Sequence, residues 1–86
     1  MSRDSSLLVF PCELPIKVLG RNEAAFRDAA IAIVRAHYGE AHRVAEQQSR
    51  EGAYLSLTIT VRAESREQID AVYNDLVAAP QIMMVL

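Results

Sequence analysis

Four residues near the end of the first predicted strand have types that suit the binding of a small anion. Lys17 supplies a cation, and Gly20, Arg21 and Asn22 form a turn before a predicted helix. Free backbone N–H groups and the positive end of a helix dipole make such a turn a natural site for a carboxylate. We therefore consider these four residues a candidate site for a small carboxylate or an amino-acid-type ligand. The alternative is that Gly20 only turns the chain and Lys17 only keeps the sheet soluble.

The sequence offers little material for catalysis or metal binding. Cys12 is the single thiol, and no histidine or predicted helix N-terminus lies near it in sequence to activate it. His37 and His42 flank a predicted helix end, without the CxxC or HxxxH spacing that brings metal ligands together. The carboxylates fall on predicted helix surfaces and turns, where burial does not change their acidity. We therefore expect a non-enzymatic protein with no catalytic residue, no metal and no cofactor.

The spacing of apolar residues predicts the elements that position these side chains. Alternation with period two predicts strands from Leu14 to Gly20 and from Ala53 to Arg62. Helical spacing predicts one helix that ends near Tyr38 and a second that lies between Ser65 and Pro80. A polar segment, 42–48, is expected to be an edge strand, because the strand that follows it needs a partner. The apolar run 82–86 is expected to be the last strand.

Several residues predict where these elements begin and end. Gly20 is expected at positive φ in a sharp turn, followed by Asn22 as the helix N-cap. Glu23 is expected in the first turn, paired with Arg27 four residues later. Gly39 is the expected C-terminal stop of this helix. The remaining signals are a hairpin turn with Gly52 in the left-handed conformation and a capping box formed by Ser65 and Gln68.

The resulting order, βαββαβ, predicts an α+β ferredoxin-like sandwich: an antiparallel four-stranded sheet with two helices on one face. The expected strand order is four-one-three-two. The side chains expected to face the helices are Leu55, Leu57, Ile59 and Val61. Those expected on the open face are Tyr54, Ser56, Thr58, Thr60, Lys17 and Leu19. We predict that Tyr54, Ser56, Thr58 and Thr60 form an interaction face for an unidentified protein partner. A homodimer that covers this face, or that continues the sheet from its apolar last strand, is an alternative.

Size, charge and cysteine content restrict the class of protein. The chain has 86 residues, of which 51% are hydrophobic, and we expect a flexible N-terminal arm over 1–12 and a single domain over 13–86. A formal net charge of −2 gives no overall basic field for nucleic acid or for an anionic membrane. No apolar stretch approaches the roughly 20 residues of a membrane-spanning helix. With one cysteine and no signal-peptide pattern, we expect a cytoplasmic protein.

Two other functions occur on the same topology. An RNA-recognition module carries several base-stacking aromatic residues on its third strand, whereas this chain has Tyr54 there and Gly52 and Leu57 at the other two positions. RNA binding is therefore the least favoured of the binding functions. Acylphosphatase, a small enzyme of this topology, has an asparagine on a central strand. The strand from Ala53 to Arg62 contains none.

The chain resembles the YbeD-like family of small bacterial proteins over about residues 8–86. The segments that carry the resemblance are Phe10-Pro11, Lys17-Val18-Leu19-Gly20, Gly52-x-Tyr54, Val72-Tyr73 with Leu76, and Met84-Val85-Leu86. The resemblance implies a ferredoxin-like fold similar to ACT-type regulatory domains, and a regulatory role related to lipoate. It transfers no catalytic residue. Lys17 and Gly20 match the end of the family's first strand.

Overall fold

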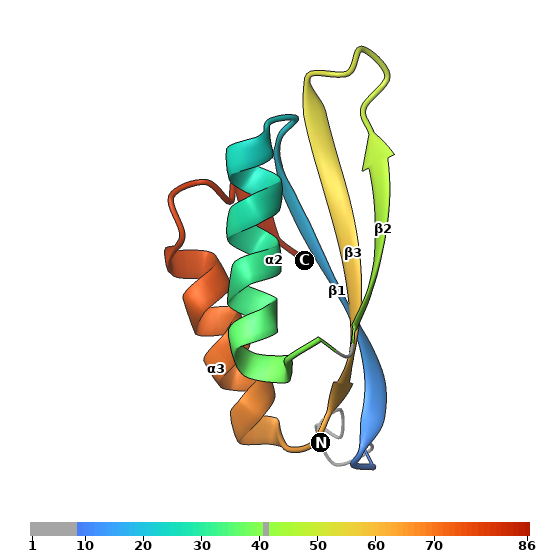
Figure 1. Cartoon of the computed structure of the whole chain (residues 1–86), viewed down its shortest axis with the longest axis vertical. Helices are drawn as coiled ribbons and strands as arrows, with labels where there is room; N and C mark the ends of the chain where they lie inside the picture. The colour runs from blue at the N-terminus through green and yellow to red at the C-terminus, as the bar shows by residue number, and fades with distance from the viewer. Residues whose placement is uncertain (1–8, 41) are drawn as a thin grey trace, which may run out of the picture.

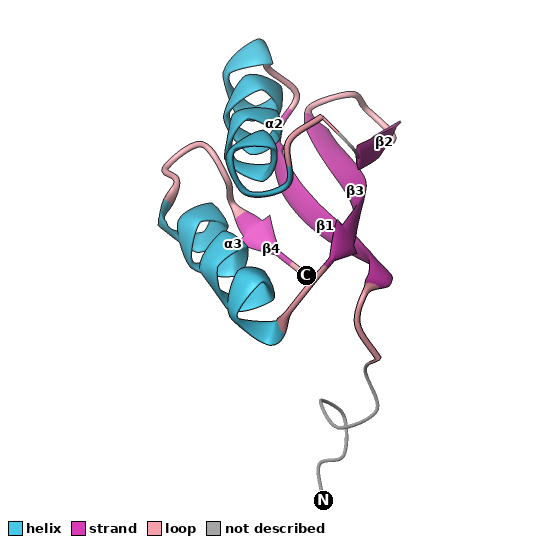
Figure 2. Cartoon of the chain, turned by 60° about the horizontal axis from the view of Figure 1, so that its bottom comes forward, coloured by secondary structure: helices cyan, strands magenta, loops and turns pink. Residues whose placement is uncertain are grey.

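The described part of the chain forms one antiparallel sheet with two helices packed on one of its faces. A computed structural model describes residues 9–40 and 42–86. The elements in chain order are β1 (Cys12–Arg21), α2 (Ala24–Tyr38), β2 (His42–Gln48), β3 (Tyr54–Ala63), α3 (Arg66–Ala78) and β4 (Met84–Val85). Both helices lie on the same side of the sheet (Figures 1 and 2). The predicted βαββαβ ferredoxin-like architecture is confirmed. Most of the predicted N-terminal arm lies outside the described residues.

The strand order is β2-β3-β1-β4, as predicted. The central strands β1 and β3 pair along their whole length, from Cys12 opposite Ala63 to Arg21 opposite Tyr54. The predicted edge strand 42–48 is confirmed as β2, which pairs with β3. The last strand is shorter than predicted, since β4 pairs with β1 only opposite Val18 and Leu19.

The core lies between the sheet and the helices. Leu55, Leu57 and Ile59 of β3 are fully buried, which confirms that the alternating apolar residues of this strand face the helices. Each helix contributes one buried stripe with the spacing of helical turns. These stripes are Phe26, Ala30 and Val34 in α2, and Ile69, Val72 and Leu76 in α3. Burying a side chain of this kind contributes about 1.5–3 kcal/mol relative to leaving it in water, so these stripes hold both helices on this one face.

Three of the predicted end signals are confirmed. Gly39 ends α2 with a φ of 69°, and Gly52 turns the β2–β3 hairpin with a φ of 79°. At the start of α3, the Ser65 hydroxyl accepts a hydrogen bond from the Gln68 N–H at 3.1 Å. The Gln68 side-chain oxygen in turn accepts from the Glu64 N–H at 2.8 Å. The two bonds form a variant of the capping box. The Gln68 side chain bonds the N–H of Glu64, the residue before the N-cap, and not the N–H of Ser65 itself.

The prediction for the start of α2 was wrong in two respects. The N-cap residue is Glu23, which makes no side-chain capping bond, and α2 has no acidic residue in its first turn. Asn22 instead donates from its Nδ2 to the Gly52 carbonyl at 2.9 Å. Asn22 therefore ties the end of β1 to the β2–β3 hairpin, because the hairpin turn comes within reach of its short side chain.

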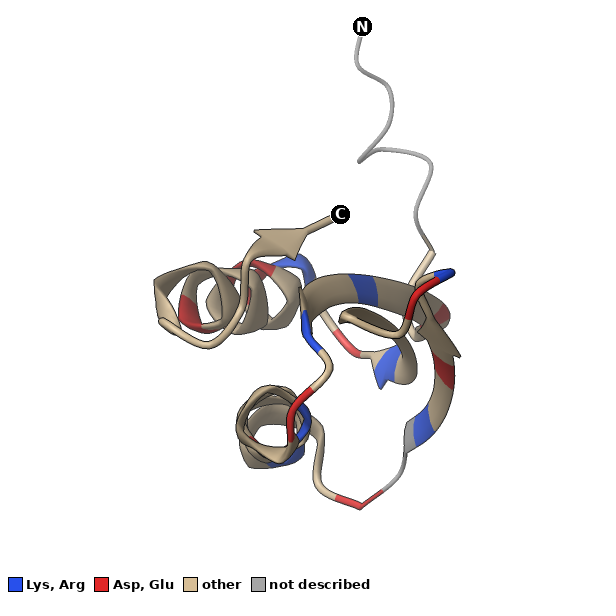
Figure 3. Ribbon diagram, turned by 90° about the horizontal axis from the view of Figure 1, so that it is seen from above, with Lys and Arg blue, Asp and Glu red and all other residues tan. Residues whose placement is uncertain are grey.

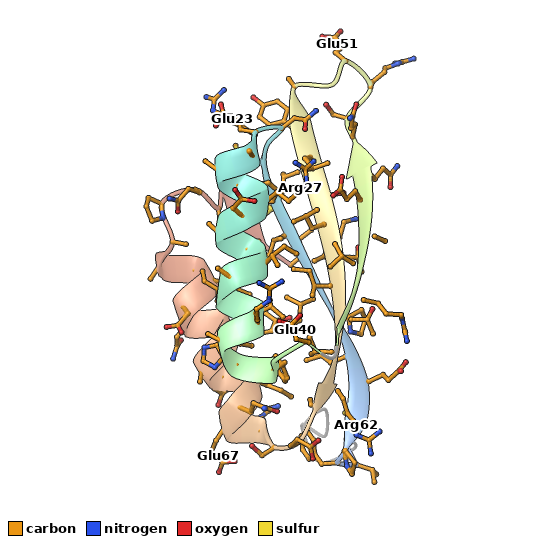
Figure 4. All side chains as sticks on the ribbon, viewed as in Figure 1. Glu23, Arg27, Glu40, Glu51, Arg62 and Glu67 are labelled. Carbon is orange, nitrogen blue, oxygen red and sulfur yellow. The ribbon has the colours of Figure 1, made fainter. Side chains whose placement is uncertain are left out.

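The predicted pair of Glu23 and Arg27 is also wrong. Arg27 donates to both carboxylate oxygens of Glu46 on β2, at 2.8 Å from Nε and 3.1 Å from Nη2. Figure 4 shows Arg27 on the side of α2 that faces the sheet. The hydrogen bond and the negative charge of Glu46 raise the pKa of Arg27 above its ordinary value. A bidentate partner across the fold takes precedence over a neighbour on the same helix.

Gly20 does not make the sharp turn that was predicted. It lies within β1 opposite Leu55, and among the described residues positive φ angles occur at Gly39 and Gly52. A Cβ atom at Gly20 would lie 2.3–2.7 Å from three ring atoms of Phe26. Glycine is therefore needed here because the Phe26 ring packs directly against the backbone of β1.

Candidate functional site

The side of the sheet away from the helices is uncovered, and we call it the open face. The strand register and the alternation of buried and exposed residues define its members. They are Glu13, Pro15, Lys17, Leu19 and Arg21 of β1, Arg43, Ala45 and Gln47 of β2, Tyr54, Ser56, Thr58, Thr60 and Arg62 of β3, and Met84 of β4, with Leu86 just after it. The predicted placement of Tyr54, Ser56, Thr58, Thr60, Lys17 and Leu19 on this face is confirmed.

The open face combines a polar centre with apolar side chains toward one end. Ser56, Thr58 and Thr60 are half-buried between neighbouring strands. Tyr54 at one end of β3 is 38% exposed, and Met84 and Leu86 at the β4 edge are 50% and 60% exposed. The face therefore has hydroxyl groups for hydrogen bonding and apolar side chains that gain from being covered.

A shallow depression lies over the half of the open face where β1, β3 and the C-terminal segment meet. Its volume is about 310 Å³. The residues that line it are Lys17, Leu19, Gln47, Gln48, Ser49, Tyr54, Ser56 and Leu86. Apart from Lys17 these side chains are uncharged, so a group that enters the depression meets one ammonium beside apolar and amide surfaces.

The structure does not gather the four residues of the predicted carboxylate site. Lys17 lines the depression, whereas the Cα of Gly20 faces the Phe26 ring on the opposite side of the sheet. Asn22 is occupied by its bond to the hairpin. Glu23 also stands at the N-terminus of α2, where its negative charge opposes a bound anion. Of the four residues, Lys17 and Arg21 share a face, and only Lys17 lines a depression.

The charged residues of the open face fall into two groups. Toward the start of β1, Glu13 pairs with Arg43 at 3.3 Å, and Arg62 lies 3.7 Å from Glu64 (Figure 4 labels Arg62). Arg43 and Arg62 were not among the predicted site residues. Alternation along β3 places Arg62 on the same face as Thr60, whereas Arg43 reaches this face through the pairing of β2 with β3. Lys17 and Arg21 have no ion pair among the described residues.

Two other features lie outside the open face. A shallow groove of about 420 Å³ lies between the helices, lined by Ala32, Ile33, Ala36, Asp75, Ala78 and Ala79. The Tyr38 hydroxyl is buried and has no hydrogen-bond partner among the described residues. Burial, followed by the nearby Tyr73 and Cys12, raises the pKa of Tyr38 above its ordinary value.

The described residues contain no cluster of three or more histidine, cysteine, aspartate or glutamate side chains that would suit a metal ion. His37, one of the two histidines weighed as a ligand, instead lies 2.7 Å from the Asp75 carboxylate, between Nε2 and Oδ2. No helix in the described part of the chain is long and apolar enough to span a membrane.

Comparison with a solved structure supports the fold. The solution structure of protein HP0495 from H. pylori superposes with a TM-score of 0.74, covering 100% of this chain and 94% of that one. The two sequences are 10% identical, so the likeness concerns the fold alone.

Comparison with known sequences identifies the family. A family model described as "Protein of unknown function (DUF493)" matches residues 5–86. A UPF0250 protein from Paraburkholderia phytofirmans is 41% identical over 87 residues, which cover 99% of this chain and 98% of the relative. A UPF0250 protein from Nitrosomonas europaea is 36% identical over 85 residues, covering 96% of this chain and 98% of the relative. These relatives are consistent with the resemblance to YbeD-like proteins, and the chain belongs to the DUF493/UPF0250 family of small bacterial proteins.

Proposed function

We propose that this protein is a non-enzymatic regulatory module of the bacterial cytoplasm that binds a protein partner on the open face of its sheet. The observation that carries this proposal is the unequal covering of the two faces. Both helices pack on one side, while the other side leaves Tyr54, Met84 and Leu86 between 38% and 60% exposed. Apolar side chains grouped on one uncovered surface stabilise a complex when a partner removes them from water.

The residue types of the open face also favour a protein partner. Tyr, Met and Arg are enriched in protein–protein interfaces, and Tyr and Arg are frequent among the residues that dominate binding energy. The open face presents Tyr54, Met84, Arg43 and Arg62 around the hydroxyl groups of its centre. Because the central side chains are short, a partner can approach the sheet closely. A second copy of the chain is one alternative partner.

The proposal is tested by placing a charge in the middle of the open face. Thr58 lies at the centre of β3, between Ala45 and Lys17 on the neighbouring strands. We expect Thr58→Glu, and independently Tyr54→Glu, to abolish capture of partners from the bacterial cytoplasm by the immobilised protein. The matched control is Val77→Glu, which adds the same charge at a 69% exposed position of α3.

The control variant should capture the same partners as the wild type. All three variants should retain the circular dichroism spectrum and unfold cooperatively. Equal capture by wild type and Thr58→Glu would place the contact elsewhere on the molecule. The molar mass measured by light scattering at micromolar concentration distinguishes a homodimer from a monomer whose partner is a different protein.

A second candidate function rests on the depression beside Lys17. A small carboxylate with an apolar part would find an ammonium group together with the apolar surfaces of Leu19 and Leu86. A ligand present at 100 times its Kd stabilises a protein by roughly 2.7 kcal/mol, which thermal denaturation detects. Amino acids, lipoate and nucleotides are the compounds to screen. A shift that disappears in Lys17→Gln would support this function, and no shift with any compound would remove it.

A further inference from the structure

We infer that the partner of the open face contributes an acidic segment, with two carboxylates flanking an apolar residue, that lies along β1. This inference rests on the proposed function and specifies the chemistry of its partner. It follows from the distribution of charge over the fold. The net charge of the chain is negative, whereas the open face has more basic than acidic side chains.

Basic side chains predominate on the open face, and acidic side chains predominate elsewhere among the described residues. The open face has four basic side chains, Lys17, Arg21, Arg43 and Arg62, against one acidic side chain, Glu13. Among the described residues outside the open face, nine are acidic and four are basic. Figure 3 shows red segments along α3, and both blue and red segments along the strands. A protein that is acidic overall therefore presents a basic surface to whatever covers its sheet.

Two of these four cations are available to a partner without breaking an existing pair. Arg43 is bonded to Glu13, and Arg62 lies near Glu64. Lys17 and Arg21 have no ion pair among the described residues. Both belong to the same strand and the same face, four residues apart, which at a rise of about 3.3 Å per residue separates their Cα atoms by about 13 Å.

The residue of the open face that lies between these two cations on β1 is apolar. Leu19 lies midway between them on β1, and Tyr54 lies opposite Arg21 on β3. Leu19 and Tyr54 also line the depression, together with Lys17 and Leu86. An extended segment with carboxylates four residues apart can pair with both Lys17 and Arg21. An apolar side chain midway between the carboxylates then lies over Leu19, because every second side chain of a strand points to the same face.

A polypeptide fits this surface better than a nucleic acid does. Proteins that bind duplex DNA through its backbone make on the order of 6–10 phosphate contacts, whereas the open face offers two unpaired cations. Single-stranded nucleic acids also need several aromatic side chains on which bases stack. Tyr54 is the aromatic residue that the described open face provides.

The test uses a displayed library of random peptides of about 12 residues, long enough when extended to run the length of β1. Peptides are selected on the immobilised full chain, and their Kd values are then measured by fluorescence anisotropy. We expect the selected peptides to be enriched in Asp and Glu flanking an apolar residue. Lys17→Glu and Arg21→Glu should each weaken their binding about tenfold, which corresponds to about 1.4 kcal/mol.

Arg66→Glu is the matched control, since it reverses an exposed charge at the start of α3, away from the open face. It should leave peptide binding within about twofold of the wild type. Thermal denaturation of each variant checks that the fold is intact. Added salt should weaken binding to the wild type, because exposed charges are screened.

The outcomes separate this inference from the proposed function. Selected peptides that are lost with Thr58→Glu, yet lack acidic residues and still bind Lys17→Glu, would overturn the inference and leave the proposed function standing. Peptides that bind equally to wild type and Thr58→Glu, or a selection that enriches nothing, would count against both. Polyuridylate that binds the wild type but not Lys17→Glu, with no acidic peptide bound, would make the ligand a nucleic acid and overturn the inference.

Discussion

Replacing Gly20 by alanine tests how β1 and α2 are held together beside the open face. An alanine Cβ would lie 2.3 Å from Phe26 Cδ1, where ordinary contact begins near 3.4 Å. The ring must therefore move by about 1 Å, although Phe26 is only 1% exposed and packed in the core. Overpacking of this kind typically costs 1–3 kcal/mol. Alanine also lowers the entropy of the unfolded chain, which offsets about 0.4–1 kcal/mol because the φ of Gly20 is not in the left-handed region.

We therefore expect Gly20→Ala to lower the free energy of unfolding by about 1–2 kcal/mol. With a urea m-value of about 1 kcal/mol/M for a domain of this size, the unfolding midpoint should fall by about 1–2 M. The same substitution made in a Phe26→Leu background should cost less, because leucine lacks the Cε1 atom and the volume left by the ring lets its Cγ and Cδ1 move away from β1. The double-mutant cycle should then give a coupling free energy of at least about 1 kcal/mol.

Gly52→Ala is the control for a different physical cause. Gly52 has a φ of 79°, and the nearest atom that its Cβ would meet is the Gln48 Oε1 at 3.8 Å. Its substitution should cost about 1 kcal/mol through backbone strain alone, equally in both backgrounds. Effects of Gly20→Ala and Phe26→Leu that simply add, to within about 0.5 kcal/mol, would refute the contact argument.

Two further predictions concern local stability. Ser65→Ala should lower the free energy of unfolding by about 1 kcal/mol, measured by urea denaturation, because the Gln68 N–H loses its acceptor; an unchanged midpoint would mean that water replaces the cap. Tyr38→Phe should raise the free energy of unfolding by about 1 kcal/mol, because it removes a buried hydroxyl that has no partner among the described residues. The raised pKa of Tyr38 favours its neutral form in the folded protein, so that contribution is complete below the unfolded value of 10.0 and is lost as the pH rises through the folded value. The wild type should therefore lose stability faster than Tyr38→Phe above about pH 10; parallel pH profiles of the two proteins would contradict this.

The sequence determined the architecture because the fold depends mainly on which residues are apolar and on their period. Strict alternation from Leu55 to Val61 is enough to assign one side of β3 to the core, since a strand turns successive side chains to opposite faces. The helical spacing of Phe26 and Val34 likewise requires that α2 bury one stripe. These patterns are local in sequence, and together they leave one face of the sheet without a cover.

Some end signals could also be predicted, because they act within a few residues. Ser65 caps α3 through Gln68, three residues away, and Gly39 stops α2 through its own backbone conformation. The same kind of prediction was wrong for the partners of Asn22 and Arg27. Each has a suitable neighbour in sequence, but its actual partner is 30 or 19 residues away. A preferred local bond is replaced when folding brings a better-placed group within reach.

The composition of the candidate site was decided by the tertiary structure. The sequence identified Lys17 and the hydroxyl residues of β3, yet it grouped Lys17 with Gly20 and Asn22, which the pleat of β1 and the packing of Phe26 turn elsewhere. The pairing of β1 with β3 and of β3 with β2 is what brings Lys17, Arg21, Arg43 and Arg62 to one surface. Hydrophobic periodicity assigns a side chain to a face but not to its neighbours across the strands. Those neighbours depend on register, and register is established only when the whole sheet assembles.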